Sequence, residues 1–263
     1  MSTCAFDPDF YDLVTDDSMF GDLDWYRQQV RAAGGPVLEL GAGTGRITLP
    51  LARDGHTIHA LDIDAHVLAA LERKAAALAP DVRRRVTVVR DDMRSFALAA
   101  RFAIVIVPFR AFLHNLTDAD RLACLAAVRA HLGPRGRLAL NVFHPALTIM
   151  ARHAGPLEGV WRSRGTWTLP DGGFLVRSEA NRYDTVAQRV HSLHRYERFD
   201  AGGDLTRTFV HRLELAYLYP PDLRRLLEQS GFVDITIAGG PDGRPFANDT
   251  DELFVTAAVA ETA

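Results

Sequence analysis

Residues 37–45 read VLELGAGTG, and this stretch decides the fold. Its first four residues are mostly apolar, as in buried strands, and the glycines that follow allow the chain to turn sharply. Beyond the turn, Thr44 is placed to cap a helix that ends at Gly55. A strand, a glycine turn and a helix predict the start of a parallel β-α-β unit.

The alternation of strand and helix continues along the chain. Asp64 and Thr117 are placed to cap two later helices, and a further helix is expected over 221–229. Apolar runs of strand length lie at 58–61, 86–89, 102–107, 137–143, 233–238 and 252–260. With the run at 37–40, they predict an α/β fold built on a doubly wound, seven-stranded, mostly parallel sheet.

Residues 145–218 break this alternation. They are rich in aromatic side chains, and the sequences at 171–173 and 201–204 are typical of hairpin turns. We predict an antiparallel β insertion of about four strands here, acting as a substrate lid, a dimer surface or both. The core of the fold then comprises residues 36–144 and 219–263.

Composition excludes several classes of protein. The chain has 30 basic and 33 acidic residues, so it lacks the positive excess expected of a nucleic-acid-binding protein. No apolar run is long enough to span a bilayer, and the acidic N-terminal segment is unlike a signal peptide. Two distant cysteines form neither a zinc motif nor a disulfide framework. We expect a cytoplasmic protein without a nucleic-acid or membrane partner.

The glycine turn indicates a bound nucleotide-like ligand. A dinucleotide-binding fingerprint needs glycine at positions 41, 43 and 46, and position 46 is Arg46, which argues against a nicotinamide or flavin cofactor. Glu39 lies two residues before the first glycine. Asp62 follows the second strand, where an acidic residue accepts hydrogen bonds from ribose hydroxyls in several cofactor families.

This pattern resembles motif I of the class I S-adenosylmethionine-dependent methyltransferases. The resemblance implies S-adenosylmethionine as methyl donor, S-adenosylhomocysteine as product, and an acid at the Glu39 position that holds the amino group of the donor. Asp92 and Met93 resemble the adenine-binding stretch of the family. The donor contacts that the resemblance implies are Tyr11, Glu39, Gly41, Ala42, Gly43, Asp62, Ile63, Asp92, Met93 and Val107.

Other segments resemble the branch of the family that acts on small molecules in secondary metabolism. Phe10 to Leu13 is similar to its N-terminal lid, which implies a helical lid over residues 1–35. The segment after the fourth strand, Val107 to Arg110, lacks the Asn/Asp-Pro-Pro-aromatic motif of adenine-modifying enzymes. Asn141 alone does not make the carboxylate cluster of the metal-dependent members, so we predict no metal.

The resemblance leaves the acceptor open, beyond a nitrogen or oxygen atom of a small molecule. His114 and His144 follow strands at the ligand-binding edge and are candidate general bases, although capping or surface roles explain each of them as well. Arg110, Trp161 and Tyr217 are candidate acceptor-binding residues, with loop exposure or core packing as the alternatives. A homodimer through the insertion is a further expectation.

Two other functions remain compatible with the same donor site. One is cyclisation or transfer of the aminocarboxypropyl chain of the donor, which releases methylthioadenosine. The other is a non-catalytic module that only binds the donor.

Overall fold

The structure is a computed structural model that describes residues 8–15, 21–144, 146–153, 158–248 and 252–260. It contains a seven-stranded sheet, called sheet A, and a four-stranded sheet, called sheet B. The strands of sheet A are β1 (Val37–Leu40), β2 (Ile58–Asp62), β3 (Val86–Arg90), β4 (Phe102–Val107), β5 (Leu132–Phe143), β10 (Phe232–Ala238) and β11 (Glu252–Val259). Those of sheet B are β6 (Arg162–Thr168), β7 (Phe174–Asp184), β8 (Arg189–Phe199) and β9 (Leu205–Ala216).

The helices connect these strands. They are α1 (Pro8–Val14), α2 (Asp22–Ala33), α3 (Thr48–Arg53), α4 (Ala65–Ala76), α5 (Pro80–Arg83), the 3-10 helix η1 (Ala111–His114), α6 (Asp118–His131), α7 (Leu147–Ala151) and α8 (Pro220–Gln229). In the described part of the chain, no helix is both long and apolar enough to cross a membrane.

Sheet A confirms the predicted mostly parallel, doubly wound sheet. Its strand order is β10-β11-β5-β4-β1-β2-β3. Strands β1 to β5 are all parallel to one another, whereas β11 is antiparallel to both β5 and β10. The order reverses beside β1, which is where ligands bind in open α/β sheets. The carboxyl ends of β1, β2, β4 and β5 therefore lie together along one edge of the sheet, which we call the carboxyl edge.

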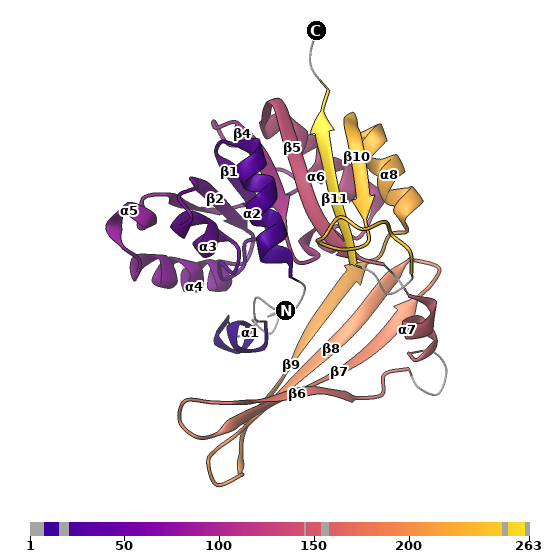
Figure 1. Ribbon diagram of the computed structural model, residues 1–263. Helices are drawn as coiled ribbons and strands as arrows, with labels where there is room; N and C mark the ends of the chain where they lie inside the picture. The colour runs from indigo at the N-terminus through magenta and orange to yellow at the C-terminus, as the bar shows by residue number, and fades with distance from the viewer. Residues whose placement is uncertain (1–7, 16–20, 145, 154–157, 249–251, 261–263) are drawn as a thin grey trace.

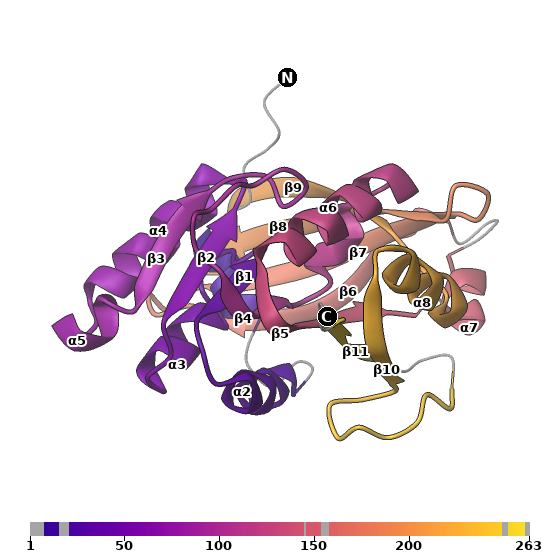
Figure 2. The ribbon, with the colours of Figure 1, turned by 90° about the horizontal axis from the view of Figure 1, so that it is seen from above.

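Alternate side chains of the strands fill two cores on opposite faces of sheet A. Val37, Ile58 and Ile104 pack under α2 and α3, whereas Leu38, Val105 and other residues of opposite parity pack under α6 and α8. Figure 2 shows α2 and α3 on one side of the sheet and α6 and α8 on the other. Burial on both faces explains the continuous apolar runs of the parallel strands.

The helix caps were predicted with mixed success. Asp64 accepts a hydrogen bond from His66 N, and Thr117 forms a capping box with Asp120, as expected. The prediction for Thr44 was wrong, because α3 begins only at Thr48 and has no side-chain cap. The backbone N–H of Gly45 bonds to Ala42 O, so a second tight turn precedes the helix. Likewise β5 begins at Leu132, five residues before the predicted 137.

Sheet B confirms the antiparallel insertion. Its strands pair in chain order, and the face that carries Leu175, Tyr196 and Phe209 packs against Phe10 of α1; we call this the inner face. Figure 1 shows sheet B extending from the lower end of sheet A, with α1 beside it. The domain limits given above stay predictions.

Candidate active site

The glycine turn lies at the carboxyl edge, between β1 and α3. The N–H groups of Gly41 and Ala42 both donate to Leu61 O, at 2.8 and 3.0 Å. Gly43 N donates to Asp62 Oδ2 at 2.9 Å, and Asp64 N donates to Asp62 Oδ1 at 2.9 Å. These bonds fix the Asp62 carboxylate against the turn. Burial raises the pKa of Asp62, and the two backbone N–H groups offset part of that rise.

Two glycines of the turn differ in what surrounds them. Both have left-handed backbones, with φ of 72° at Gly41 and 54° at Gly43. A Cβ atom on Gly41 would come within 2.5 Å of Ala111 Cβ, and Met93 Cε lies 3.9 Å away. A Cβ atom on Gly43 would have no atom of the described chain within 4 Å. Gly41 is therefore packed between elements, whereas Gly43 faces open space in which a ligand can approach the backbone.

Glu39 is an acid buried beneath this turn. Only 2% of its surface is exposed, and Thr48 Oγ1 donates a hydrogen bond of 2.5 Å to Glu39 Oε2. Burial raises the pKa of Glu39 to about 8, although the Thr48 hydrogen bond and the nearby Arg46 lower it in part. A cation placed beside this carboxyl would favour its ionised form.

Arg46 anchors the turn to α2. Its NH1 and NH2 donate to the two carboxylate oxygens of Asp22 at 2.7 and 2.6 Å, in a bidentate pair. The side chains are 9% and 0% exposed, so the pair is buried. The Arg46 guanidinium also lies 4.9 Å from the ring centre of Phe109. The arginine that argues against a dinucleotide site therefore joins three elements around the turn.

The end of β4 is held in an uncommon backbone conformation. Phe109 and Arg110 have positive φ values of 53° and 66°, and Phe109 N donates to Asn141 Oδ1 at 2.8 Å. Arg110 makes a bidentate pair with Glu252, with NH2 to Oε2 at 2.7 Å. The structure thus uses Arg110 to tie β4 to β11, while one third of its side chain stays exposed.

Residues expected near an adenine lie beside the turn. Ile63 is an unusually exposed apolar side chain, with 61% of its surface accessible, directly after Asp62. Met93 is placed next to Gly41, and its sulfur accepts a hydrogen bond from Asn115. The Asp92 carboxylate is bound by Arg94 through several N–H groups, which lower its pKa. Arg94 therefore occupies the Asp92 carboxylate oxygens that were expected to contact the adenine of the donor.

The candidate bases lie in different surroundings. His114 ends η1 close enough to Asp62 for the two charges to interact, and burial lowers the pKa of its imidazole. The His144 ring packs against Phe246 at 4.9 Å and Tyr219 at 5.6 Å, on the side of α8. The structure brings His114, rather than His144, to the turn.

The remaining sequence candidates are divided between the site and the core. Tyr11 of α1 is edge-on to Phe109, and burial raises its pKa. Val107 is buried, and its carbonyl accepts a hydrogen bond from Tyr26. Tyr217 is 1% exposed among other tyrosines, so packing explains it. The Arg195 guanidinium lies 4.7 Å from the ring centre of Trp161. Because the Arg195 side chain is on the face of sheet B opposite to the inner face, Trp161 also lies away from the glycine turn.

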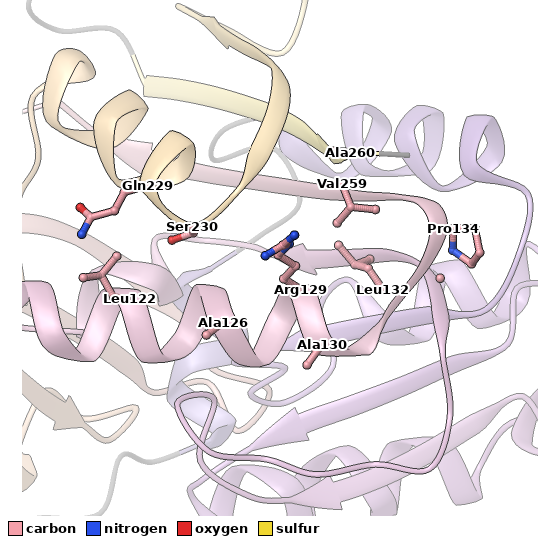
Figure 3. Close-up of a pocket in the computed structure, with 11 residues that line it drawn as sticks. Leu122, Ala126, Arg129, Ala130, Leu132, Pro134, Gln229, Ser230, Val259 and Ala260 are labelled. Carbon is pink, nitrogen blue, oxygen red and sulfur yellow. The ribbon is translucent and has the colours of Figure 1, made fainter. Parts of the chain in front are cut away.

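A surface groove lies on another part of the molecule. It has a volume of about 730 Å³ and lies between α6 and α8, beside the start of β5 and the end of β11 (Figure 3). The start of a parallel strand is at the opposite edge from the glycine turn, so this groove is separate from the candidate site.

Comparisons with known proteins all identify methyltransferases as similar to this chain. Residues 37–136 match a family model described as a methyltransferase domain. The cypemycin N-terminal methyltransferase of a Streptomyces species is 25% identical over 249 residues, which is 93% of this chain and 92% of that protein. The structure of the CcbJ methyltransferase from Streptomyces caelestis aligns with a TM-score of 0.75 and 25% identity over 96% of each chain.

Residues 37–136 thus form a methyltransferase domain, and the comparisons indicate that the chain is an S-adenosylmethionine-dependent methyltransferase. A further similar structure is the glycopeptide N-methyltransferase MtfA in complex with S-adenosylmethionine, with a TM-score of 0.58 and 29% identity over 94% of this chain and 91% of that one. These comparisons support S-adenosylmethionine as the cofactor of this methyltransferase.

The residues around the turn fit that cofactor. The open space at Gly43 allows close approach of the donor, and the buried Glu39 carboxyl offers a partner for its amino group. Asp62 is held by two backbone N–H groups at the end of β2, where its carboxylate could accept hydrogen bonds from ribose hydroxyls.

Sequence reasoning missed residues that act through tertiary contact. Asp12 accepts hydrogen bonds from Thr44 at 2.5 Å and from Lys74 at 2.7 Å, and so fastens α1 to the turn. Asp22 is the buried partner of Arg46, and β9, which carries His211, contacts η1, which ends at His114. Their partners are distant in sequence, so no local pattern marks them.

Proposed function

We propose that this methyltransferase moves the methyl group of S-adenosylmethionine to a nitrogen of a small molecule bound between the carboxyl edge of sheet A and the inner face of sheet B. The observation that carries the proposal is His114, an accessible imidazole at that edge. It lies near Asp62, the acid that we assign to the ribose of the donor. Two relatives whose names specify N-methylation, those for cypemycin and glycopeptides, support nitrogen rather than oxygen.

The chain's own residues supply alignment and exclusion of water. The bound donor supplies a methyl group activated by its sulfonium charge. Glu39 holds the amino end, Asp62 holds the ribose, and Met93 and Ile63 provide apolar contact for the adenine. Holding two reactants in line contributes about 7–11 kcal/mol in well-oriented systems. α1 helps to exclude water, because it contacts both Thr44 and the inner face of sheet B.

Matched acceptors test this function. Glucosamine and alanyl-alanine offer an amine, and glucose replaces the amine of glucosamine with a hydroxyl. We expect mass spectrometry to find a methylated amine and S-adenosylhomocysteine, with glucose unchanged. Methylthioadenosine as by-product would contradict methyl transfer. A methylated glucose without any methylated amine would contradict nitrogen as the acceptor. The homodimer, the cytoplasmic location and the lack of nucleic-acid or membrane partners stay predictions from the sequence.

Donor binding is expected to release a proton from Glu39. With a pKa of about 8, Glu39 is mostly protonated at pH 7, and the cationic amino group of the donor favours the ionised form. We expect net release of about 0.7–0.9 proton per donor bound at pH 7. Calorimetric titration in phosphate and in Tris measures this number, since these buffers differ in ionisation heat. Glu39→Gln should abolish the release; equal heats in both buffers for the unmodified enzyme would refute it.

Replacing Asp62 with alanine is expected to weaken donor binding. Loss of the ribose hydrogen bonds costs about 1–3 kcal/mol, or about 5- to 150-fold in Kd measured by calorimetry. Asp64→Ala is the matched control, because Asp64 caps α4 through His66 N. That variant should lose stability while keeping its donor affinity. Equal affinities of Asp62→Ala and the unmodified enzyme would remove Asp62 from the site.

A further inference from the structure

Sheet B brings a second histidine, His211, to the same edge as His114. His211 of β9 pairs in register with His194 of β8, and their ring centres are 6.1 Å apart. Since residues 209 and 211 point to the same face of a strand, His211 lies on the inner face with Phe209. It is near enough to His114 and Asp64, both at the carboxyl edge of sheet A, for their charges to affect its pKa. β9 also contacts η1, the short helix that ends at His114, so the two imidazoles belong to elements that pack against each other at the carboxyl edge.

His114 has its ring nitrogens available. In the described ranges, no residue makes a hydrogen bond to this ring, whereas Asp62 is close enough to interact with its charge. The side chain is accessible although protein surrounds it closely, as expected for a group that lines a cleft. An imidazole in this position can contact a bound molecule directly.

The surroundings of His114 and His211 favour the neutral form of both imidazoles. Burial lowers the pKa of both His114 and His211, and the nearby Arg177 lowers that of His211 further. Burial, with a further contribution from Arg177, lowers the pKa of His194 to about 3. Asp62 opposes the shift at His114 and Asp64 opposes it at His211, yet burial is the larger effect for each. The inner face also carries Glu179, which pairs with Arg164 at 3.0 Å.

We propose that His114 and His211 hold the acceptor nitrogen between them and take its proton before methyl transfer; this rests on the proposed function. An amine arrives as an ammonium ion, and its N–H proton passes to one neutral imidazole. The freed lone pair then forms the C–N bond while the C–S bond breaks and its electron pair goes to sulfur. The positive charge of one ring disfavours protonation of the other, so the pair takes one proton. The acceptor is therefore an amine that enters in its protonated form.

Nuclear magnetic resonance of the histidine rings tests the pair without turnover. In enzyme saturated with S-adenosylhomocysteine, glucosamine or alanyl-alanine should shift the resonances of His114 and His211. Glucose should leave them unmoved. His191, on the opposite face of β8 beside Glu214, is the internal control. His114→Gln should also raise the pKa of His211, because it removes a neighbouring charge. Unmoved His114 and His211 resonances with both amines, or an unchanged His211 pKa, would overturn the proposal.

Kinetics separates a proton-accepting role from a structural one. For a methylated amine, His211→Gln should lower kcat about 100-fold at pH 7, with the KM for the donor unchanged. The unmodified enzyme should lose activity only as pH falls below the ordinary histidine range. The variant should keep gaining activity toward the pKa of the amine, because solvent must then take the proton. His191→Gln should match the unmodified enzyme. Equal pH profiles for the His211 variant and the unmodified enzyme would overturn the pair.

The two proposals fail differently. Absence of any methylated amine, with S-adenosylhomocysteine still bound, contradicts the proposed function. Methylated amines formed at full rate by His114→Gln and His211→Gln contradict only the histidine pair.

Discussion

Arg46→Met is expected to lower the free energy of unfolding by about 3–5 kcal/mol. Asp22 has no exposed surface and receives both guanidinium nitrogens of Arg46, so removing the arginine leaves a buried carboxylate without its partner. Methionine has a similar length and adds no cavity of comparable size. Chemical denaturation followed by circular dichroism measures the change.

A more exposed arginine is the matched control for that variant. Arg27 pairs with Asp24 and Asp54, and these side chains are 30%, 81% and 24% exposed. Arg27→Met should therefore cost about 0–1 kcal/mol. Adding Asp22→Leu to Arg46→Met should recover stability, because no buried charge then remains unpaired. A loss below about 1 kcal/mol for Arg46→Met alone would contradict the role of this pair.

Gly41→Ala is expected to destabilise the fold, whereas Gly43→Ala is expected to block the donor. At Gly41 the new methyl group would meet Ala111 Cβ at 2.5 Å, and a short alanine cannot rotate away. The left-handed backbone costs about 1–2 kcal/mol and overpacking about 1–3 kcal/mol more. Chemical denaturation should show a fall in the free energy of unfolding equal to both costs together.

Gly43→Ala has the same backbone cost without the clash. No atom of the described chain lies within 4 Å of its new methyl group, so stability should fall by only about 1–2 kcal/mol. The methyl group instead occupies the space of the donor, and affinity should fall about 5- to 150-fold by calorimetry. If Gly43→Ala bound S-adenosylhomocysteine normally, the open space at Gly43 would not be the donor site.

The fold could be predicted from the sequence because its signals are local. A strand buried on both faces needs a continuous apolar run, and a helix start needs a capping side chain, as at Asp64 and Thr117. The glycine turn could be predicted in the same way, because glycine combines a left-handed backbone with room for a close approach. Asp62 was a candidate because of its place after the second strand, and Glu39 because of the resemblance to motif I of the methyltransferases.

The predictions that failed or stayed ambiguous depended on contacts between distant residues. Thr44 faces Asp12 rather than capping α3, and Arg110 pairs with Glu252, 142 residues away. Of two equivalent histidines, His114 lies close enough to Asp62 and His211 for their charges to interact, whereas His144 packs against Phe246. The sequence by itself therefore determined the parallel sheet, the insertion and the glycine turn, because each has a local periodicity or spacing. Only the tertiary structure decided which candidate side chains lie near the glycine turn, because that depends on how η1 and sheet B pack at the carboxyl edge.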